Sequence, residues 1–385
     1  MAALIQPTRE DEVIDTIADA VRDDRKLAIV GGGTKSAIGA PAEAYPLSLA
    51  RLSGVVDYDP AELVLTVRPG TPLIEVQALV FAQDQMLAFE PFDHGPLFGN
   101  TAGGATIGGV VAAGVSGSQR VSCGGARDHL LGFRAVSGRG ELFVAGAKVV
   151  KNVTGYDLPK LAAGSWGRLF ALTELTLKVL PRPRVTASCV IQGLTVERAV
   201  EAMSVAMRSQ AEVAAAAHIP GHIRHGRSRT GFRIQGFGPS VEARCAKLVA
   251  TLSAMGKVEA MSDDEASGFW NSLRTLPSLG RERALWRINL PPRGAPALVN
   301  ALAQLGAQWL LDWAGGLVWI GFDGPPDVVR NVTARAGGHA TLIRGGAALR
   351  ASTPTFHPLS PGVDALEVRI RRAFDPAGVF ETGRF

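Results

Sequence analysis

The sequence predicts an α+β fold with two regions of different character. In residues 1–183, helices and short strands alternate irregularly and are interrupted by two long glycine-rich loops. In residues 184–345, the order strand, helix, strand, strand, helix, strand occurs twice, which is the ferredoxin-like pattern. Two such units side by side are expected to make one broad sheet covered by helices. The last segment, residues 346–385, carries one more helix and a turn and is expected to return to the first region.

In the first region, Thr8 is placed to cap a helix whose apolar face is marked by Val13 and Ile17. A short apolar strand then runs directly into a glycine loop at residues 31–36. Pro72 suits the first turn of a helix that continues to Gln83. Leucine and valine alternate with polar residues over 175–179, which predicts a half-exposed strand. Further strands are predicted at 27–30, 55–58, 63–67, 131–136 and 142–144.

In the second region, the two repeats are predicted from hydrophobic periodicity and turn residues. The first repeat has strands at 185–191, 213–219, 229–236 and 257–260, with helices at 195–209 and 239–254. The second has strands at 286–290, 308–313, 316–321 and 339–343, with helices at 295–304 and 326–336. The final segment contains a helix over 363–374.

Composition excludes several classes of protein. The net charge of +5 is spread without runs of lysine or arginine and without interleaved aromatic residues, so nucleic-acid binding is not expected. The three cysteines form no CxxC pair, so neither a zinc site nor a cysteine-held iron–sulfur cluster is expected. The cysteines are instead expected to be reduced thiols in a cytoplasmic protein. No signal peptide and no transmembrane segment is predicted.

The first glycine-rich loop fits neither common phosphate-binding motif. A P-loop requires glycine directly before the Lys-Ser pair, and Thr34 occupies that position. A dinucleotide-binding fingerprint requires a third glycine where Ser36 stands, and an acidic residue about 20 positions later. A tight turn and a phosphate cradle remain equally open for this loop alone.

The second glycine-rich stretch, residues 91–125, favours the phosphate cradle, because it carries ten glycines and little charge. Ordering each glycine costs about 1–2 kcal/mol of backbone entropy, so such a stretch is expected to approach a ligand closely. Two separated glycine loops suit a long ligand with a pyrophosphate at its middle. The alternative is a flexible, poorly packed loop.

Other polar residues are weaker candidates. Arg127 and Asp128 form either a surface ion pair or an anion-facing arginine held by a loop-stabilising aspartate. His94 and His339 are candidates to face a ligand. The cluster of His218, His222 and His225 is interpreted as solvated loop histidines rather than a metal site, and no metal is expected. No motif for a catalytic serine or cysteine is present.

Several motifs together resemble the FAD-binding PCMH-type domain of the vanillyl-alcohol-oxidase family. They lie at residues 31–35, 90–93, 105–109 and 122–128. The segments 151–161, 164–167, 285–288, 337–341 and 375–380 resemble the FAD-binding subunit of bacterial glycolate oxidase more specifically. The similarity spans nearly the whole chain.

The resemblance implies two α/β subdomains, about 1–50 and 51–183, with FAD extended between them and followed by a cap domain. It also implies that residues of both glycine loops line the pyrophosphate, that residues 114–128 surround the ribose and the middle of the cofactor, and that residues 151–153 lie near the adenine. The implied cofactor contacts are Gly31, Gly32, Gly33, Thr34, Lys35, Pro91, Gly103, Gly104, Ala105, Thr106, Ile107, Gly108, Gly109, Gly114, Gly117, Gly124, Arg127, Asp128, Lys151, Asn152, Val153, Gly155, Tyr156 and Asp157.

Family members with covalent flavin use a histidine in the first loop or a cysteine just before the second, and this sequence has neither, so FAD is expected to bind non-covalently. The resemblance implies oxidation of glycolate, a 2-hydroxy acid, to glyoxylate within a complex that contains a larger flavin subunit and an iron–sulfur subunit. Peripheral association with the inner membrane is expected only through that complex. Candidates for contact with substrate are His94, His339 and Arg287. A stand-alone FAD-dependent 2-hydroxy-acid dehydrogenase and a flavin-free assembly subunit are the alternatives.

Overall fold

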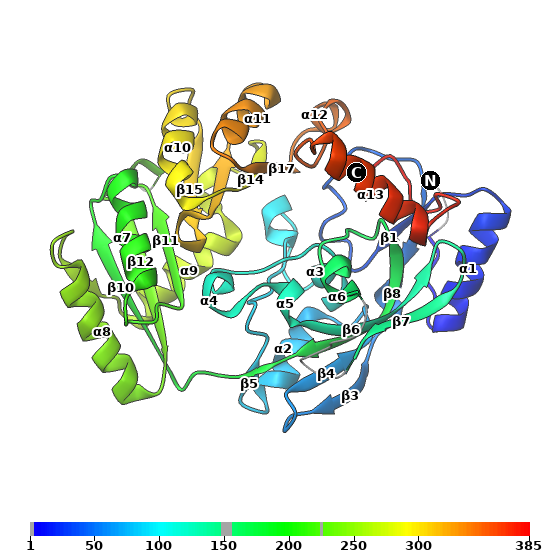
Figure 1. The fold of residues 1–385 in the computed structure, drawn as a ribbon, viewed down its shortest axis with the longest axis horizontal. Helices are drawn as coiled ribbons and strands as arrows, with labels where there is room; N and C mark the ends of the chain where they lie inside the picture. The colour runs from blue at the N-terminus through cyan, green and yellow to red at the C-terminus, as the bar shows by residue number, and fades with distance from the viewer. Residues whose placement is uncertain (1–3, 148–155, 224–225) are drawn as a thin grey trace. The chain divides into compact units, whose positions relative to one another are not determined.

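The computed structural model describes residues 4–147, 156–223 and 226–385, which fall into two compact units (Figure 1). Unit 1 is built from Met1–Gly117, Gly124–Arg182 and Pro358–Phe385, and unit 2 from Ser118–Cys123 and Pro183–His357. No described helix is long and apolar enough to cross a membrane.

Unit 1 begins with a small parallel pair of strands, β1 (Leu27–Val30) and β2 (Tyr45–Ser48), packed against α1 (Glu10–Arg22). Helix α1 starts where Glu12 accepts a hydrogen bond from the Thr8 amide at 2.6 Å. Its apolar face buries Val13 and Ile17 completely, as the spacing predicted. Glu10 also pairs with Arg134 at 2.6 Å, which ties α1 to strand β6 of the next sheet.

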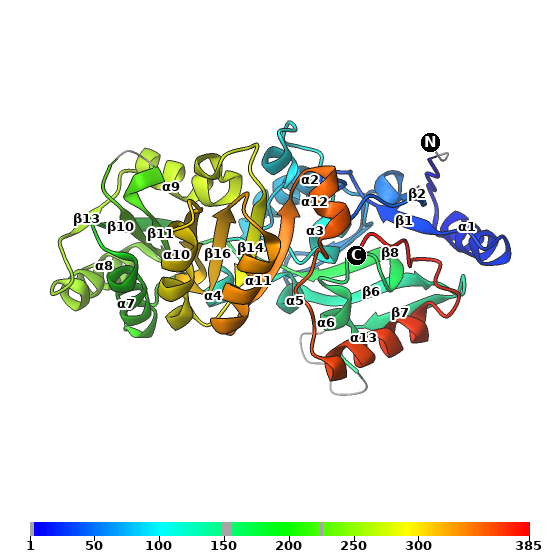
Figure 2. The same ribbon diagram turned by 90° about the horizontal axis from the view of Figure 1, so that it is seen from above.

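The main sheet of unit 1 is antiparallel, with the strand order β3-β4-β8-β6-β7 (Figure 2). Its strands are β3 (Val55–Asp59), β4 (Val64–Val67), β6 (Leu130–Ser137), β7 (Leu142–Gly146) and β8 (Phe170–Lys178). Phe133, Phe143 and Phe170 pack ring against ring, and Phe374 from α13 (Pro361–Phe374) joins them. The segment that carries α13 therefore belongs to the core of unit 1.

The shorter elements of unit 1 surround this sheet. They are η1 (Leu49–Arg51), α2 (Leu73–Phe81), β5 (Gln85–Met86), η2 (Gly95–Phe98), α3 (Ile107–Ala112), α5 (Ala126–His129), α6 (Leu158–Ala162) and β9 (Leu180–Pro181). Strands β5 and β9 pair with each other. The prediction of a half-exposed strand over 175–179 is wrong. Strand β8 is central, and Thr176 is buried against Thr66 of β4, with 3.2 Å between their hydroxyl oxygens. A hydroxyl pair can satisfy polar groups inside a sheet that water does not reach.

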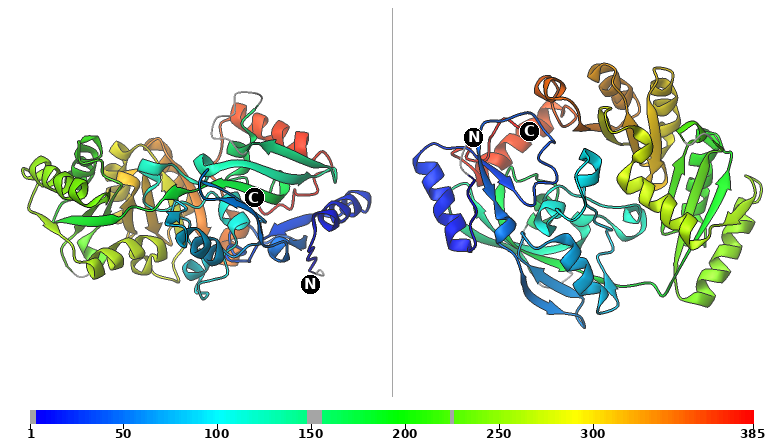
Figure 3. Two further views of the ribbon diagram at one scale, coloured as in Figure 1. Left: turned by 90° about the horizontal axis from the view of Figure 1, so that it is seen from below. Right: turned by 180° about the vertical axis from the view of Figure 1, so that it is seen from behind.

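Unit 2, coloured green to orange in Figure 3, contains an eight-stranded antiparallel sheet. Its strand order is β13-β10-β12-β11-β15-β16-β14-β17. The first repeat is β10 (Val185–Gln192), α7 (Val196–Arg208), β11 (Ala215–Ile219), β12 (Arg229–Gly236), α8 (Gly238–Leu252) and β13 (Val258–Ala260). The second is β14 (Leu285–Asn289), α10 (Ala295–Ala303), β15 (Gln308–Asp312), β16 (Leu317–Gly321), α11 (Pro326–Arg335) and β17 (His339–Arg344). From the edge of the sheet to its centre, each repeat places its strands in the chain order fourth, first, third, second. Strand β11 of the first repeat pairs with β15 of the second at the centre. The predicted fold class is confirmed.

The helices of the two repeats cover one face of this sheet, where Trp286, Phe232 and Ile320 are buried in a common core. Helix α9 (Asp263–Thr275) was not predicted, and it packs on residues of the other face. Trp270 of α9 donates from its indole nitrogen to the Ser188 hydroxyl at 2.9 Å. Because side chains of successive strand residues point to opposite faces, this contact places α9 on the face away from the helices of the repeats. The remaining elements of unit 2 are α4 (Arg120–Cys123), η3 (Gly221–Ile223), η4 (Pro277–Leu279), η5 (Pro292–Gly294), η6 (Trp313–Gly315) and α12 (Ala347–Ser352).

Arg330 stabilises the outer end of the second repeat. Its guanidinium donates to the carbonyls of Ala340 and Pro354, the latter at 2.6 Å, and lies over the ring of Trp286 at 5.0 Å. Burial lowers the pKa of Arg330 to about 10. We expect Arg330→Met to lower the free energy of unfolding by about 2 kcal/mol, since buried carbonyls lose their donor. Urea unfolding followed by tryptophan fluorescence measures this, and the exposed Arg335→Met in the same helix is the control. Equal urea midpoints for Arg330→Met and Arg335→Met would contradict this stabilising role of Arg330.

Candidate functional site

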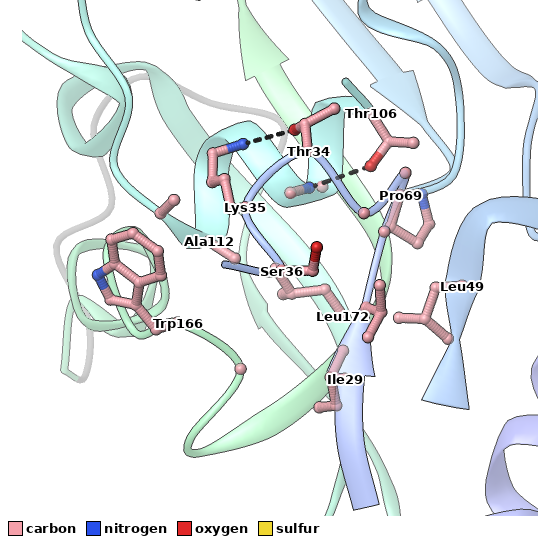
Figure 4. Close-up of a pocket in the computed structure, with 18 of the residues that line it drawn as sticks. Ile29, Thr34, Lys35, Ser36, Leu49, Pro69, Thr106, Ala112, Trp166 and Leu172 are labelled. Atoms are coloured by element: carbon pink, nitrogen blue, oxygen red, sulfur yellow. Dashed lines mark hydrogen bonds between the residues drawn. The ribbon is translucent and has the colours of Figure 1, made fainter. Parts of the chain in front are cut away.

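A pocket with an empty volume of about 840 Å³, partly open to solvent, lies in unit 1 where the first glycine loop faces helix α3 (Figure 4). Its walls come from β1 and the loop after it, from α3, from the turn before β8, and from the last two residues of the chain. The lining residues are Ile29, Val30, Gly31, Gly32, Gly33, Thr34, Lys35, Ser36, Leu49, Pro69, Thr106, Gly108, Gly109, Ala112, Ala113, Ser165, Trp166, Gly167, Phe170, Leu172, Arg384 and Phe385.

The first loop requires glycine for two reasons. Gly33 has φ +76°, a left-handed conformation that side-chain-bearing residues rarely adopt. A side chain at Gly32 would collide with the carbonyl oxygen of Gly104, and one at Gly31 with the hydroxyl of Thr106. The two glycine loops, about 70 residues apart in sequence, therefore pack backbone against backbone along the pocket.

The second loop is fixed by hydrogen bonds at both ends. The Thr106 hydroxyl accepts from the Gly109 amide at 3.3 Å and caps α3. The Asp93 carboxylate accepts from the amides of Gly103 at 2.9 Å, Ala105 at 3.3 Å and Gly95 at 2.8 Å. A Cβ on Gly108 would come within 2.8 Å of the Pro69 carbonyl oxygen. These contacts hold α3 close to the turn at Pro69.

Lys35 brings a positive charge to the pocket. Its ammonium lies 3.5 Å from the Thr34 hydroxyl, and Figure 4 shows the side chain directed toward that group. Burial lowers the pKa of Lys35 to about 8, and the negative charge of Asp93 partly opposes that shift. Lys35 is therefore a cation at neutral pH, and any anion that enters the pocket would stabilise its charged form further.

The other side of the pocket is apolar and aromatic. Trp166, with φ +58°, lies 5.4 Å from Phe385 between ring centroids. Arg384, which also lines the pocket, has a different role. It donates to the carbonyls of Lys35 and Ser36 at 2.8 Å each and of Ile38 at 2.7 Å. Its own carbonyl accepts from the Ala40 amide at 2.9 Å. Arg384 thus fixes the chain that leaves the first glycine loop.

The sequence-predicted cofactor residues divide into three groups. Those that line the pocket are Gly31, Gly32, Gly33, Thr34, Lys35, Thr106, Gly108 and Gly109. Those described but outside its lining are Pro91, Gly103, Gly104, Ala105, Ile107, Gly114, Gly117, Gly124, Arg127, Asp128, Tyr156 and Asp157. Lys151, Asn152, Val153 and Gly155 lie outside the described residues. Contact of all three groups with a cofactor stays a prediction.

The candidates for substrate contact do not share one unit. His94 is buried in unit 1 and stacks on Phe92 at 4.8 Å. Arg287 and His339 belong to unit 2, where His339 packs against His357 at 5.4 Å. The interpretation of His218 as a solvated loop histidine is wrong, since it lies in β11, only 1% exposed, bonded to the Thr230 hydroxyl at 2.9 Å. Burial lowers the pKa of His218 to about 4, so it is a neutral core residue at physiological pH. His222 is exposed as expected, and His225 lies outside the described residues.

Sequence reasoning missed Asp93, Pro69, Trp166, Arg384 and Phe385 as residues that build or line the site. Asp93 offered a signal, because a carboxylate two residues before a glycine in a glycine-rich stretch is typical of a loop that bonds its own amides. Trp166 lies in the motif segment 164–167, whereas Phe385 offered no signal, since its proximity to Trp166 arises only in the folded chain.

Comparison with known proteins agrees with this architecture. A family model described as an FAD binding domain matches residues 1–146. The glycolate oxidase subunit GlcE of Escherichia coli (strain K12) is 32% identical over 375 residues, which cover 97% of this chain and 96% of that protein. The D-lactate dehydrogenase of Anaerostipes hadrus is 30% identical over 192 residues, or 49% of this chain and 38% of that protein.

Among solved structures, p-cresol methylhydroxylase with substrate bound superimposes with a TM-score of 0.70 at 14% identity, covering 99% of this chain and 88% of that one. At that identity the likeness shows the fold alone. It agrees with a PCMH-type FAD-binding fold followed by a second domain with a large antiparallel sheet. The chain belongs to the family of the glycolate oxidase subunit GlcE, among the proteins with a PCMH-type FAD-binding domain.

Proposed function

We propose that this chain is the FAD-binding subunit of a multi-subunit glycolate oxidase, in which glycolate is oxidised to glyoxylate. The observation that carries the proposal is the pocket of unit 1, which two glycine loops and Lys35 line on one side and apolar side chains on the other. Similarity over 97% of the chain to a glycolate oxidase subunit supports the substrate and the complex.

The residues of the pocket fit FAD. Backbone amides of the first loop can donate to a pyrophosphate that no side chain obstructs, and Lys35 adds the matching charge. Trp166 and Phe385 contribute aromatic rings to the apolar side of the pocket. Bound FAD would supply two-electron redox chemistry. The described residues that line the pocket include no histidine or cysteine to form a covalent link, which supports non-covalent binding.

The partners follow from the same proposal. A larger flavin subunit and an iron–sulfur subunit would accept the electrons, since the three cysteines, Cys123, Cys189 and Cys245, are free thiols. The domain limits that go with it are 1–183 for the FAD-binding domain, 184–345 for the cap, and 346–385 for a segment that returns to the FAD-binding domain.

Flavin content and assembly test the proposal together. We expect purified protein to show flavin absorbance, and acid precipitation to release all of that flavin into the supernatant. Co-purification from native cells should bring down a second flavoprotein and an iron–sulfur protein. Protein that never takes up FAD but still assembles is instead a flavin-free assembly subunit. Glycolate oxidation with a dye acceptor by the isolated chain would show a stand-alone dehydrogenase.

The affinity for FAD should depend on pH through Lys35. A bound diphosphate favours the ammonium form, so above about pH 8 binding must take up a proton. We expect the affinity to stay constant between pH 6 and pH 7 and to fall up to about tenfold per pH unit above pH 8. Titration of FAD fluorescence across this range measures it. Arg at position 35 stays charged throughout, so Lys35→Arg should remove most of the dependence. An equally steep fall in Lys35→Arg would contradict the role of Lys35.

A further inference from the structure

Two arginines of unit 2 share one tryptophan ring, although they come from distant parts of the sequence. The guanidinium carbon of Arg120 lies 4.4 Å from the ring centroid of Trp313, and that of Arg287 lies 5.0 Å from it. Arg120 stands in α4, Arg287 in the middle of β14, and Trp313 at the start of η6 directly after β15. Two positive charges are therefore held against one tryptophan ring.

Neither guanidinium forms an ion pair with a carboxylate among the residues that the structure describes. Arg287 donates to the Asn289 side chain, at 3.1 Å. The buried Asp312 acts on Arg287 from a distance, and its two oxygens already accept from the Ser118 hydroxyl at 2.8 Å and the Trp313 amide at 2.7 Å. Burial and the charge of Arg120 lower the pKa of Arg287 to about 10. The two arginines thus repel each other in the absence of an anion.

The backbone that presents the ring is strained. Trp313 has φ +53° and Ala314 has φ +55°, two successive non-glycine residues in the left-handed region. Each such residue is unfavourable, and strain of this kind clusters at ligand sites. Asp312 fixes the turn from one side, and Ser118 and Ser122 fix the segment that carries Arg120, the latter by donating to the Ala214 carbonyl at 2.8 Å. The Trp313 turn and the segment that carries Arg120 are therefore held in place by hydrogen bonds within unit 2.

We propose that Arg120 and Arg287, held on Trp313, bind the carboxylate of a small organic acid. Each guanidinium can donate two parallel hydrogen bonds to a carboxylate, and the anion removes the repulsion between the two. The site lies wholly within unit 2, so it does not depend on the proposed cofactor pocket. Inorganic phosphate shares the same chemistry and is the competing ligand.

Titration of the flavin-depleted full chain distinguishes these ligands. At constant ionic strength, we expect glycolate and glyoxylate to change the tryptophan fluorescence with a dissociation constant of about 1 mM, and inorganic phosphate to bind at least about tenfold more weakly. Because FAD content is measured separately, absence of flavin leaves this result intact. Tighter binding of phosphate than of either acid would overturn the carboxylate assignment.

Variants locate the site. Arg120 is exposed, so Arg120→Met leaves the core unchanged and should weaken carboxylate binding about tenfold. The double variant Arg120→Met with Arg287→Met should abolish it, and exposed Arg293→Met is the matched control. Thermal melting verifies that each variant is folded. Unchanged affinity in Arg120→Met, or an equal loss in Arg293→Met, overturns the proposal.

Discussion

Leucine at position 109 is expected to reduce the affinity for FAD by at least about 1,000-fold, which corresponds to about 4 kcal/mol. Gly109 lines the pocket in the first turn of α3. A Cβ there would meet only the Thr106 hydroxyl, at 3.3 Å, so the fold can accept a side chain. The isobutyl group of Gly109→Leu would occupy the space between the two glycine loops, where a diphosphate must approach the backbone. Equilibrium dialysis with FAD measures the loss.

Gly362→Leu is the matched control for this variant. Gly362 also lies in the first turn of a helix of unit 1, in α13, and a Cβ there has open space around it. We expect it to bind FAD as the unsubstituted protein does, and both variants to melt within a few degrees of it. Full flavin content in Gly109→Leu would show that the pocket between the loops is not the cofactor site. Gly108 would be a poorer choice, because a Cβ there meets the backbone of Pro69 and the fold itself would be disturbed.

The sequence predicts local features of this molecule well. The ferredoxin-like repeats were predictable because each strand and helix has its own periodicity, and the repeat order then determines the strand order. Both glycine loops were visible because a close backbone approach leaves glycine in the sequence. The loop at Gly32 shows this directly, since any side chain there would strike Gly104.

Features that depend on neighbours distant in the sequence were not predictable. Alternation predicts that Thr176 lies at the surface, but β4 and β6 flank its strand and leave it buried. His218 falls at the end of the predicted strand 213–219 and was grouped with the loop histidines that follow it, but the strand pairing buries it beside Trp309, at 5.8 Å between ring centroids. Helix α9 did carry a local signal, the capping box of Ser262 and Glu265, which sequence reasoning overlooked.

The segment Ser118–Cys123 is the clearest example of a position that sequence alone misjudges. It lies near the end of the glycine-rich stretch, between Gly117 and Gly124, where the resemblance implies cofactor contacts, and yet it belongs to unit 2. The reason is specific hydrogen bonding: Ser118 donates to Asp312, and Gln119 donates to Gln235 of β12. A serine or glutamine in a glycine-rich loop has many possible partners, and only the fold selects between them.

Substitution of Arg384 by alanine is expected to weaken FAD binding by about 30- to 100-fold, although Arg384 is positioned to act on the cofactor only through the loop it holds. Its guanidinium fixes the carbonyls of Lys35, Ser36 and Ile38, so its removal frees the chain that orients the loop amides and Lys35. A hydrogen bond from a charged donor contributes about 1.5–3 kcal/mol to stability. Arg384 is half-buried, so water can replace part of each lost bond.

The pH profile separates this positioning role from a general loss of stability. If Arg384 holds Lys35 in the pocket, Arg384→Ala should lose affinity and also flatten the pH dependence, because a released Lys35 regains the ordinary pKa of a solvated lysine. Arg384→Lys keeps the charge but cannot reach three carbonyls at once, so an intermediate affinity is expected. The exposed Arg372→Ala in α13 should change neither property. Weaker binding with an unchanged pH profile would mean that Arg384 supports the pocket without controlling Lys35, because only a displaced ammonium alters the proton uptake that accompanies binding.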